Sequence, residues 1–168
     1  MEFDPREDLQ PFQKAHLLHP MHQVPTELIL TIRRIATDGN LGTSYLEARQ
    51  EDSGLTYDFF WLTDRVIGHA RGHSPDLRWP TYPVNHSVDR AIDCDIWPVE
   101  SIAQISVRNP TVWKDDFSGF NIETAVTVKL VDGTALEIGS VEPRDPGLRK
   151  RREAIIDALL TTVGKTVR

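Results

Sequence analysis

The sequence predicts an α+β domain in which a strongly bent antiparallel sheet of about seven strands, or a partly open β-barrel, is capped by a C-terminal helix. Three observations predict this fold. Apolar residues alternate in short segments from residue 43 onward, an Asp132-Gly133 pair lies between two such segments, and one amphipathic segment ends the chain. The 168 residues suit one domain, so we expect an N-terminal arm over 1–42 and the domain itself over 43–164.

The N-terminal arm is predicted to be irregular at first and then to form a short helix. Prolines, glutamines, histidines and acidic residues fill positions 1–25 and interrupt any continuous helix there. Within residues 26–37, Leu28 and Ile32 are spaced for one face of a helix. Because Leu28, Leu30 and Ile32 also alternate, a strand is the alternative for this segment.

The strand segments are separated by two long stretches without clear periodicity. Leu55–Leu62 is apolar on both faces in its second half, as in a closed barrel or a sandwich. Gly68 marks either a bulge or a close approach of two backbones. The predicted strands are residues 43–50, 55–62, 65–71, 92–97, 102–107, 122–130 and 135–138, and the predicted loops are residues 72–90 and 109–119.

The last third of the chain carries the clearest local signals. Asp132-Gly133 between alternating apolar residues predicts a hairpin with a tight type I′ turn. The following segment has one apolar stripe and then Gly164, which is placed to end the helix. The stripe consists of Leu148, Ile155, Ile156, Leu159, Leu160 and Val163.

Composition points to a soluble, unexported protein. The formal net charge of −6 and the pI near 5.5 disfavour general nucleic-acid binding, which requires a basic surface. A single cysteine, Cys94, has no internal partner for a disulfide, so the reducing cytoplasm is the expected compartment. The sequence has no apolar run of the roughly 18 residues that span a bilayer, and its acidic N-terminus differs from a secretory signal.

Three sequence segments resemble the bacterial branch of the pleckstrin-homology-like (PH-like) superfold. Phe60–Ile67 is similar to its "L-T-D-x-R-L-I" hairpin, Trp97–Ile102 to its "I-P-L-x-x-I" segment, and Val126–Ile138 to its "V-T-L-x-x-x-D-G-x-x-x-x-I" hairpin. The resemblance covers residues 43–164. It implies seven strands in two nearly orthogonal sheets closed by a C-terminal helix, and it implies binding and assembly rather than catalysis.

Large aromatic residues in the two predicted loops are the first candidates for a binding surface. Aromatic side chains in loops either cover the end of a barrel or anchor an interface. If they are exposed, they form a partner-binding surface that consists of Trp79, Tyr82, Trp113, Lys114 and Phe117.

A basic run at the start of the final predicted helix is the second candidate. Cations are mildly unfavourable at the positive end of the helix dipole, which hints that the run binds a phosphate, an acidic partner or an anionic lipid. A solvated helix end, balanced by nearby acidic residues, is the simpler alternative. The residues of this candidate anion site are Arg144, Arg149, Lys150, Arg151 and Arg152.

Other reactive residues form no coherent catalytic or metal-binding motif. His16, His19 and His22 could gather on a metal, yet Pro20 interrupts any rigid helical presentation of them. His69 and His73, four residues apart on a strand, lie roughly 13 Å apart, too far for one ion. The carboxylates that flank Cys94 raise the pKa of its thiol, opposite to the need of a nucleophile. We therefore expect no cofactor and no metal.

The leading functional hypothesis is a non-enzymatic module that binds another protein, encoded nearby, within a cytosolic complex. An immunity or inhibitor protein directed against one toxin is a variant of this hypothesis. A peripheral membrane module that binds anionic lipid or phosphate is the second hypothesis, and a metal-dependent hydrolase is the third. Pairing of two copies through edge strands remains an open alternative.

Overall fold

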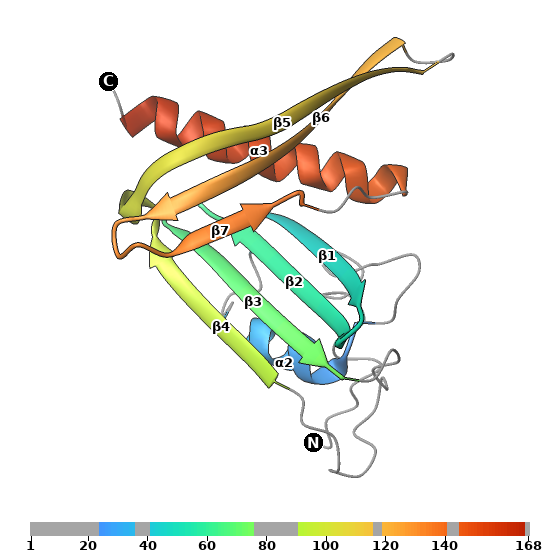
Figure 1. Cartoon of the computed structure of the whole chain (residues 1–168). Helices are drawn as coiled ribbons and strands as arrows, with labels where there is room; N and C mark the ends of the chain where they lie inside the picture. Colours follow the sequence, from blue (N-terminus) through green and yellow to red (C-terminus); the bar gives the residue numbers. More distant parts are fainter. Residues whose placement is uncertain (1–23, 36–40, 76–90, 116–118, 141–144, 167–168) are drawn as a thin grey trace.

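The computed structural model describes residues 24–35, 41–75, 91–115, 119–140 and 145–166, and these form two antiparallel sheets and two α-helices (Figure 1). The first sheet has the strand order β1-β2-β3-β4 and the second has the order β5-β6-β7. The elements are α2 (Thr26–Ile35), β1 (Thr43–Glu51), β2 (Gly54–Leu62), β3 (Val66–Ser74), β4 (Ala91–Pro98), the 3-10 turn η1 (Val99–Ser101), β5 (Ile102–Asp115), β6 (Gly119–Leu130), β7 (Ala135–Ile138) and α3 (Pro146–Thr166).

The four-stranded sheet lies between two hydrophobic cores. One face packs on α2, and the other faces the three-stranded sheet and α3 (Figure 1). Strand β2 belongs to both cores, because Leu55, Tyr57, Phe59 and Trp61 point to α2 while Phe60 and Leu62 point the other way. All nine residues of β2 are buried, and its second half, Phe59–Leu62, is apolar on both faces, as predicted.

Residues 26–35 form a helix, not the alternative strand. Leu28, Ile29 and Ile32 are buried against the sheet, whereas Leu30, which the strand pattern would have placed beside them, is 40 % exposed. Their spacing over three and four residues is the helical one. Although it lies in the predicted N-terminal arm, α2 therefore supplies part of the core of the domain.

The hairpin between β6 and β7 is confirmed, but its turn is not the predicted type I′. The Leu130 amide donates to the Thr134 carbonyl, and the Gly133 amide donates to the Leu130 carbonyl. The loop is therefore three residues long, with Gly133 at φ 89°, as in a type I turn followed by a glycine bulge. The Asp132 carboxylate accepts the Thr134 amide at 2.8 Å and stabilises this turn.

The prediction of a loop over residues 109–119 is wrong for most of this segment. Strand β5 continues to Asp115 and β6 begins at Gly119, so the two form a long ribbon. The register shifts between Arg108 and Thr111, where Pro110 cannot donate to the ladder. The strand resumes after this irregularity through Thr111-Val112-Trp113, residue types that favour strands.

Helix α3 starts where the sequence predicted but ends later. It continues through Gly164 to Thr166, so that glycine does not end the helix. Four members of the predicted stripe are buried, namely Leu148, Ile155, Ile156 and Leu159, whereas Leu160 is 42 % exposed. The side chain of Val163 lies outside the described residues.

The architecture confirms an α+β fold with two sheets and a C-terminal helix. Among the described strands, no pairing joins an edge of the first sheet to an edge of the second, so the sheets do not close into a barrel. Within the same part of the chain, neither helix combines the length and apolar character needed to cross a bilayer.

Candidate functional site

The inner face of the four-stranded sheet changes from apolar to charged along its strands. Leu62 and Ile67 stand directly opposite each other in the core, and Phe60 pairs with His69 in the next row. One row further, four charged residues lie side by side across all four strands. This charged row consists of Glu47, Asp58, Arg71 and Asp93.

Asp58 is the centre of the charged row. Its side chain is 1 % exposed, and its carboxylate accepts hydrogen bonds from Arg49 Nη2, His69 Nε2 and Arg71 Nε, the last two at 2.8 Å. Burial alone would raise the pKa of Asp58, but these three neighbours overcome that effect and hold it below its usual range. The buried carboxylate is therefore ionised and fixes three side chains from two neighbouring strands.

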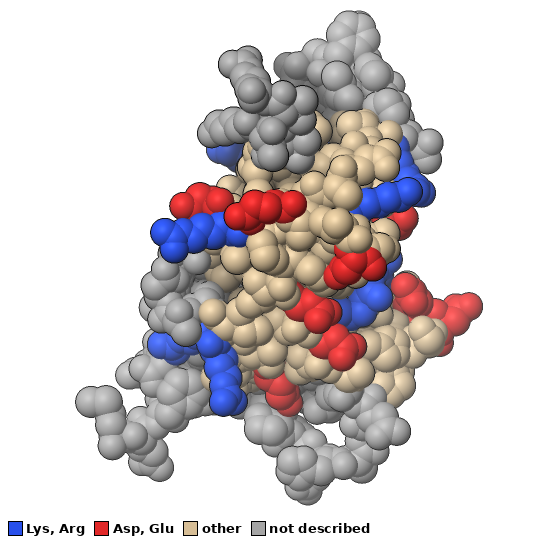
Figure 2. Space-filling model, turned by 90° about the vertical axis from the view of Figure 1, so that its left-hand side faces the viewer, with Lys and Arg blue, Asp and Glu red and all other residues tan. Residues whose placement is uncertain are grey.

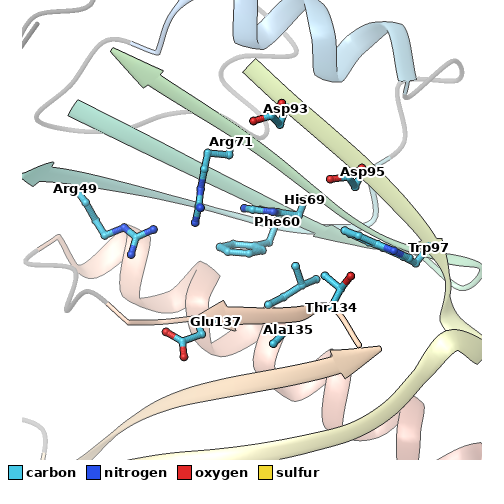
Figure 3. A pocket seen from close by; sticks show the side chains of 11 residues that line it. Arg49, Phe60, His69, Arg71, Asp93, Asp95, Trp97, Thr134, Ala135 and Glu137 are labelled. Atoms are coloured by element: carbon cyan, nitrogen blue, oxygen red, sulfur yellow. The ribbon is translucent and has the colours of Figure 1, made fainter. Parts of the chain in front are cut away.

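These side chains face a groove with a volume of about 500 Å³ (Figure 3). One wall is the inner face of the four-stranded sheet, and the other is β7 with the residue before it. The lining residues are Arg49, Phe60, His69, Arg71, Asp93, Asp95, Trp97, Thr134, Ala135, Leu136 and Glu137. A volume of this size lies within the usual range of ligand-binding pockets.

The two walls of the groove are held together by Trp97 and the hairpin turn. The indole of Trp97 donates from Nε1 to the Asp132 carboxylate at 3.0 Å. Deeper in the groove, the ring of His69 stacks on Phe60 with centroids 4.7 Å apart. The aromatic side chains therefore have fixed orientations before any ligand arrives.

Glu47, at the end of the charged row beside α3, is in a different state from Asp58. It is 3 % exposed and accepts hydrogen bonds from the Gly139 amide and the Ser140 hydroxyl. Burial is the main cause that raises the pKa of Glu47 to about 7, and the charge of Asp58 adds to it. Arg152 is a buried residue of α3 and lies close to Gly139. A Cβ added to Gly139 would lie 2.9 Å from Cδ of Arg152.

The predicted aromatic surface is not brought into this groove. Trp79, Tyr82 and Phe117 lie outside the described residues. Trp113 and Lys114 belong to the far part of β5, paired with Asn121 and Phe120, and their side chains are also outside the described residues. The surface therefore remains a sequence-based prediction, and the groove is a separate candidate.

The predicted basic run does not present one continuous face. Lys150 is exposed, Arg149 and Arg151 are half-buried, and Arg152 is only 2 % exposed. Helical geometry turns Arg152 toward the buried side of α3, together with Leu148. Arg144 lies outside the described residues, so the anion-binding hypothesis stays a prediction carried by Lys150 and its half-buried neighbours.

The other candidates from the sequence are the N-terminal histidines and Cys94. The three histidines at positions 16, 19 and 22 lie outside the described residues. Among the residues that are described, no group of three or more histidine, cysteine or acidic side chains is arranged to hold a metal ion. Burial, with the charge of Asp95, raises the pKa of the Cys94 thiol to about 11, so this cysteine stays protonated at neutral pH.

Sequence reasoning missed the network of Asp58, Arg49 and Arg71, and it considered His69 chiefly as a possible metal ligand. The available signal was Asp58, the one charged residue in a strand whose other residues are mostly apolar, because a buried charge requires partners. Arg49 and Arg71, on the two neighbouring strands, were the nearest basic candidates once the register was known.

Comparison of this chain with protein-family models, with curated proteins and with solved structures found no match.

Proposed function

We propose that this protein is a non-enzymatic recognition module that binds another protein through the groove between the four-stranded sheet and β7. The observation that carries the proposal is the buried carboxylate of Asp58, which holds Arg49, His69 and Arg71 in position at the groove. A groove prepared in this way loses little conformational freedom when a ligand enters.

The lining of the groove supports selective recognition. Arg71 is 50 % exposed even though its Nε is bonded to Asp58, so the outer part of the guanidinium faces the groove. Asp93 and Asp95, on β4, place negative charge on the same wall, beside Arg71 and His69. Charges of both signs at fixed positions reject ligands of the wrong pattern, and aromatic rings such as Trp97 add apolar contact area.

The overall fold and the free cysteine also support the proposal. Two antiparallel sheets followed by a C-terminal helix are compatible with a PH-like module, a fold that the sequence resemblance associates with binding, although the described sheets do not close into a barrel. The single free thiol, Cys94, suits a reducing cytoplasm, where we place the complex.

Partner capture followed by measured affinities tests the proposal. The purified protein is used to isolate a partner from its native host, and the affinity of the purified partner is measured by titration calorimetry. We expect Arg71→Ala and Trp97→Ala to weaken binding at least about tenfold, because both side chains line the groove.

Arg34→Ala is the matched control. Arg34 is exposed on α2, on the opposite side of the sheet from the groove, so its replacement should leave the affinity unchanged. Circular dichroism verifies that each variant is folded. If the groove variants bind the partner as tightly as the control does, or if no partner is found, the proposal is wrong.

A further inference from the structure

Strand β4 is an edge strand that also forms one wall of the groove. Within the described residues it pairs with β3 alone, and no described strand pairs with the backbone groups on its other side. It lies at the border of the four-stranded sheet (Figure 1). A free edge of this kind can accept an additional strand from another chain.

The register shows which peptide groups of β4 face outward. The Val99 amide donates to the Arg65 carbonyl at 2.8 Å, and hydrogen-bonded positions alternate along an antiparallel pair. The peptide groups of Asp93 and Asp95 therefore face β3, while those of Ile92, Cys94 and Ile96 face away from it. Pro98, which cannot donate, stands at a position that requires no donor to β3.

The side chains of β4 divide into a charged face and an apolar face. Asp93 and Asp95 are exposed and line the groove. Ile92 and Cys94 pack against the core under α2, and Ile96 on the same face is 43 % exposed. On the side of the molecule that carries this edge, acidic side chains lie along the middle, with basic ones between and beside them (Figure 2).

We propose that a partner segment in extended conformation, in which basic and apolar residues alternate, adds to the free edge of β4. The inference rests on the proposed function and specifies its ligand. Basic side chains of the segment would stand beside Asp93 and Asp95 and enter the groove, and the intervening apolar side chains would cover Ile96. A lysine or arginine in the groove would also lie near the ring of Trp97, which favours cations.

Charge complementarity selects this occupant over a second copy of the chain. Two β4 strands paired with each other would bring carboxylates to adjacent positions, which is destabilising. The same aspartates, which within the described residues have no ion-pair partner, would instead be neutralised by a basic segment. Two residues along a strand correspond to roughly 6.6 Å, so both carboxylates match consecutive basic positions of the partner.

Three labelled peptides test the pattern by fluorescence anisotropy. The first alternates valine with lysine over eight residues, the second contains the same residues with the lysines grouped, and the third has glutamate in place of lysine. We expect the alternating lysine peptide to bind at least about tenfold more tightly than either of the others. Equal binding of the alternating and grouped lysine peptides would mean general charge attraction and would overturn the inference.

Variants of the protein locate the binding. Asp93→Asn combined with Asp95→Asn should weaken binding of the alternating lysine peptide at least about tenfold, because the complementary charges are lost while the shape of the side chains is kept. Asp157→Asn, an exposed carboxylate on α3, serves as the matched control and should leave binding unchanged. Equal effects of the two changes would contradict docking at β4.

Backbone methylation distinguishes an added strand from a segment held only by its side chains. In an added strand, alternate peptide groups face β4, so N-methylation of one alternate set of amides should abolish binding and N-methylation of the other should be tolerated. Binding that survives methylation of both sets, or is lost with both, overturns the inference. If these peptides fail while a native partner still depends on Arg71 and Trp97, only this inference is wrong and the proposed function stands.

Discussion

Asp58 determines the positions of the charged side chains in the groove, so its charge should also support the folded state. Asp58→Asn retains the shape of the side chain but removes the negative charge that Arg49, His69 and Arg71 share. We expect the free energy of unfolding to fall by about 2–4 kcal/mol, because a buried ion-pair network loses one partner. Urea denaturation at pH 7 measures this change.

Asp93→Asn is the matched comparison for that experiment. Asp93 lies in the same charged row but is exposed, so the same substitution should change stability by less than about 0.5 kcal/mol. If both variants were destabilised equally, or neither were, Asp58 would not have the anchoring role that its hydrogen bonds indicate.

Glu47 should make the protein less stable as the pH rises toward neutrality. In the folded state its pKa is raised to about 7, above its ordinary value of 4.5, so the folded state holds a proton between these two values that the unfolded state releases. The stabilisation that protonated Glu47 gives the folded state, relative to the ionised form, is fully present below about pH 4.5 and is lost as the pH rises through 7. We expect a decline on the order of 2–3 kcal/mol between pH 5 and 8, measured by urea denaturation at each pH.

Glu47→Gln provides the control for this pH dependence. Glutamine resembles the protonated acid and can still accept the Gly139 amide, so the variant should be nearly constant in stability from pH 5 to 8. Asp58 does not contribute to the decline in this pH range. Its pKa is lowered, so the stability that ionised Asp58 provides is lost only in stronger acid. The same decline in both proteins would show that another group causes it.

At the scale of elements, the pairing of β2 with β3 depends on Gly68. A Cβ at this position would lie 2.0 Å from Cε2 of Trp61, its direct cross-strand partner, so the indole ring lies over the glycine. We expect Gly68→Ala to destabilise the protein by about 1–3 kcal/mol, since the ring must move within a packed core. Thermal or urea unfolding measures the change.

A second substitution separates this contact from a general effect of alanine in the strand. When Trp61 is replaced by leucine, the obstructing ring is absent, so adding Gly68→Ala to Trp61→Leu should have little further effect. If the two substitutions were additive, the close approach of the ring to Gly68 would not explain the requirement for glycine.

Helix α2 should behave as a core element. We expect Ile32→Ala to lower the free energy of unfolding by about 2–4 kcal/mol, because Ile32 is fully buried against the sheet. Leu30→Ala, on the same helix at a position that is 40 % exposed, should have a much smaller effect. Similar losses for the two variants, measured by urea denaturation, would contradict the packing of α2 seen here.

Local patterns in the sequence predicted the elements well where the chain itself determines the structure. Strand β2, the hairpin at Gly133 and the start of α3 each follow from periodicity or turn residues. The errors concern the loop around Pro110 and the end of α3. Pairing with β6 carries β5 past Pro110, and the helical segment continues through Gly164 in spite of that residue's low helix propensity.

The groove could not be predicted because its residues meet only through the strand register. Arg49, Asp58 and Arg71 lie far apart in the sequence and become neighbours across three strands. A change of one position in the pairing would turn each of these side chains to the other face. Composition and motif spacing contain no information of this kind, and they indicate the loops and the basic run instead.

At the scale of the whole molecule, the two hydrophobic cores should unfold together, since both depend on β2. Phe59 and Trp61 belong to the same core as α2, while Phe60 and Leu62, on the same strand, belong to the core that contains the second sheet and α3. Loss of β2 from one core removes it from the other. We therefore expect α2 to be coupled energetically to β7, although the two lie on opposite sides of the four-stranded sheet (Figure 1).

Native-state hydrogen exchange of Ile32→Ala tests this coupling. The backbone amide of Val128, which lies in the ladder between β6 and β7, should lose the same protection free energy, about 2–4 kcal/mol, as the buried amides of α2 and β2. Leu30→Ala serves as the control and should leave both regions nearly unchanged. If Ile32→Ala accelerates exchange in α2 alone, the helix opens without the rest of the chain, and the shared strand does not join the two cores into one cooperative unit.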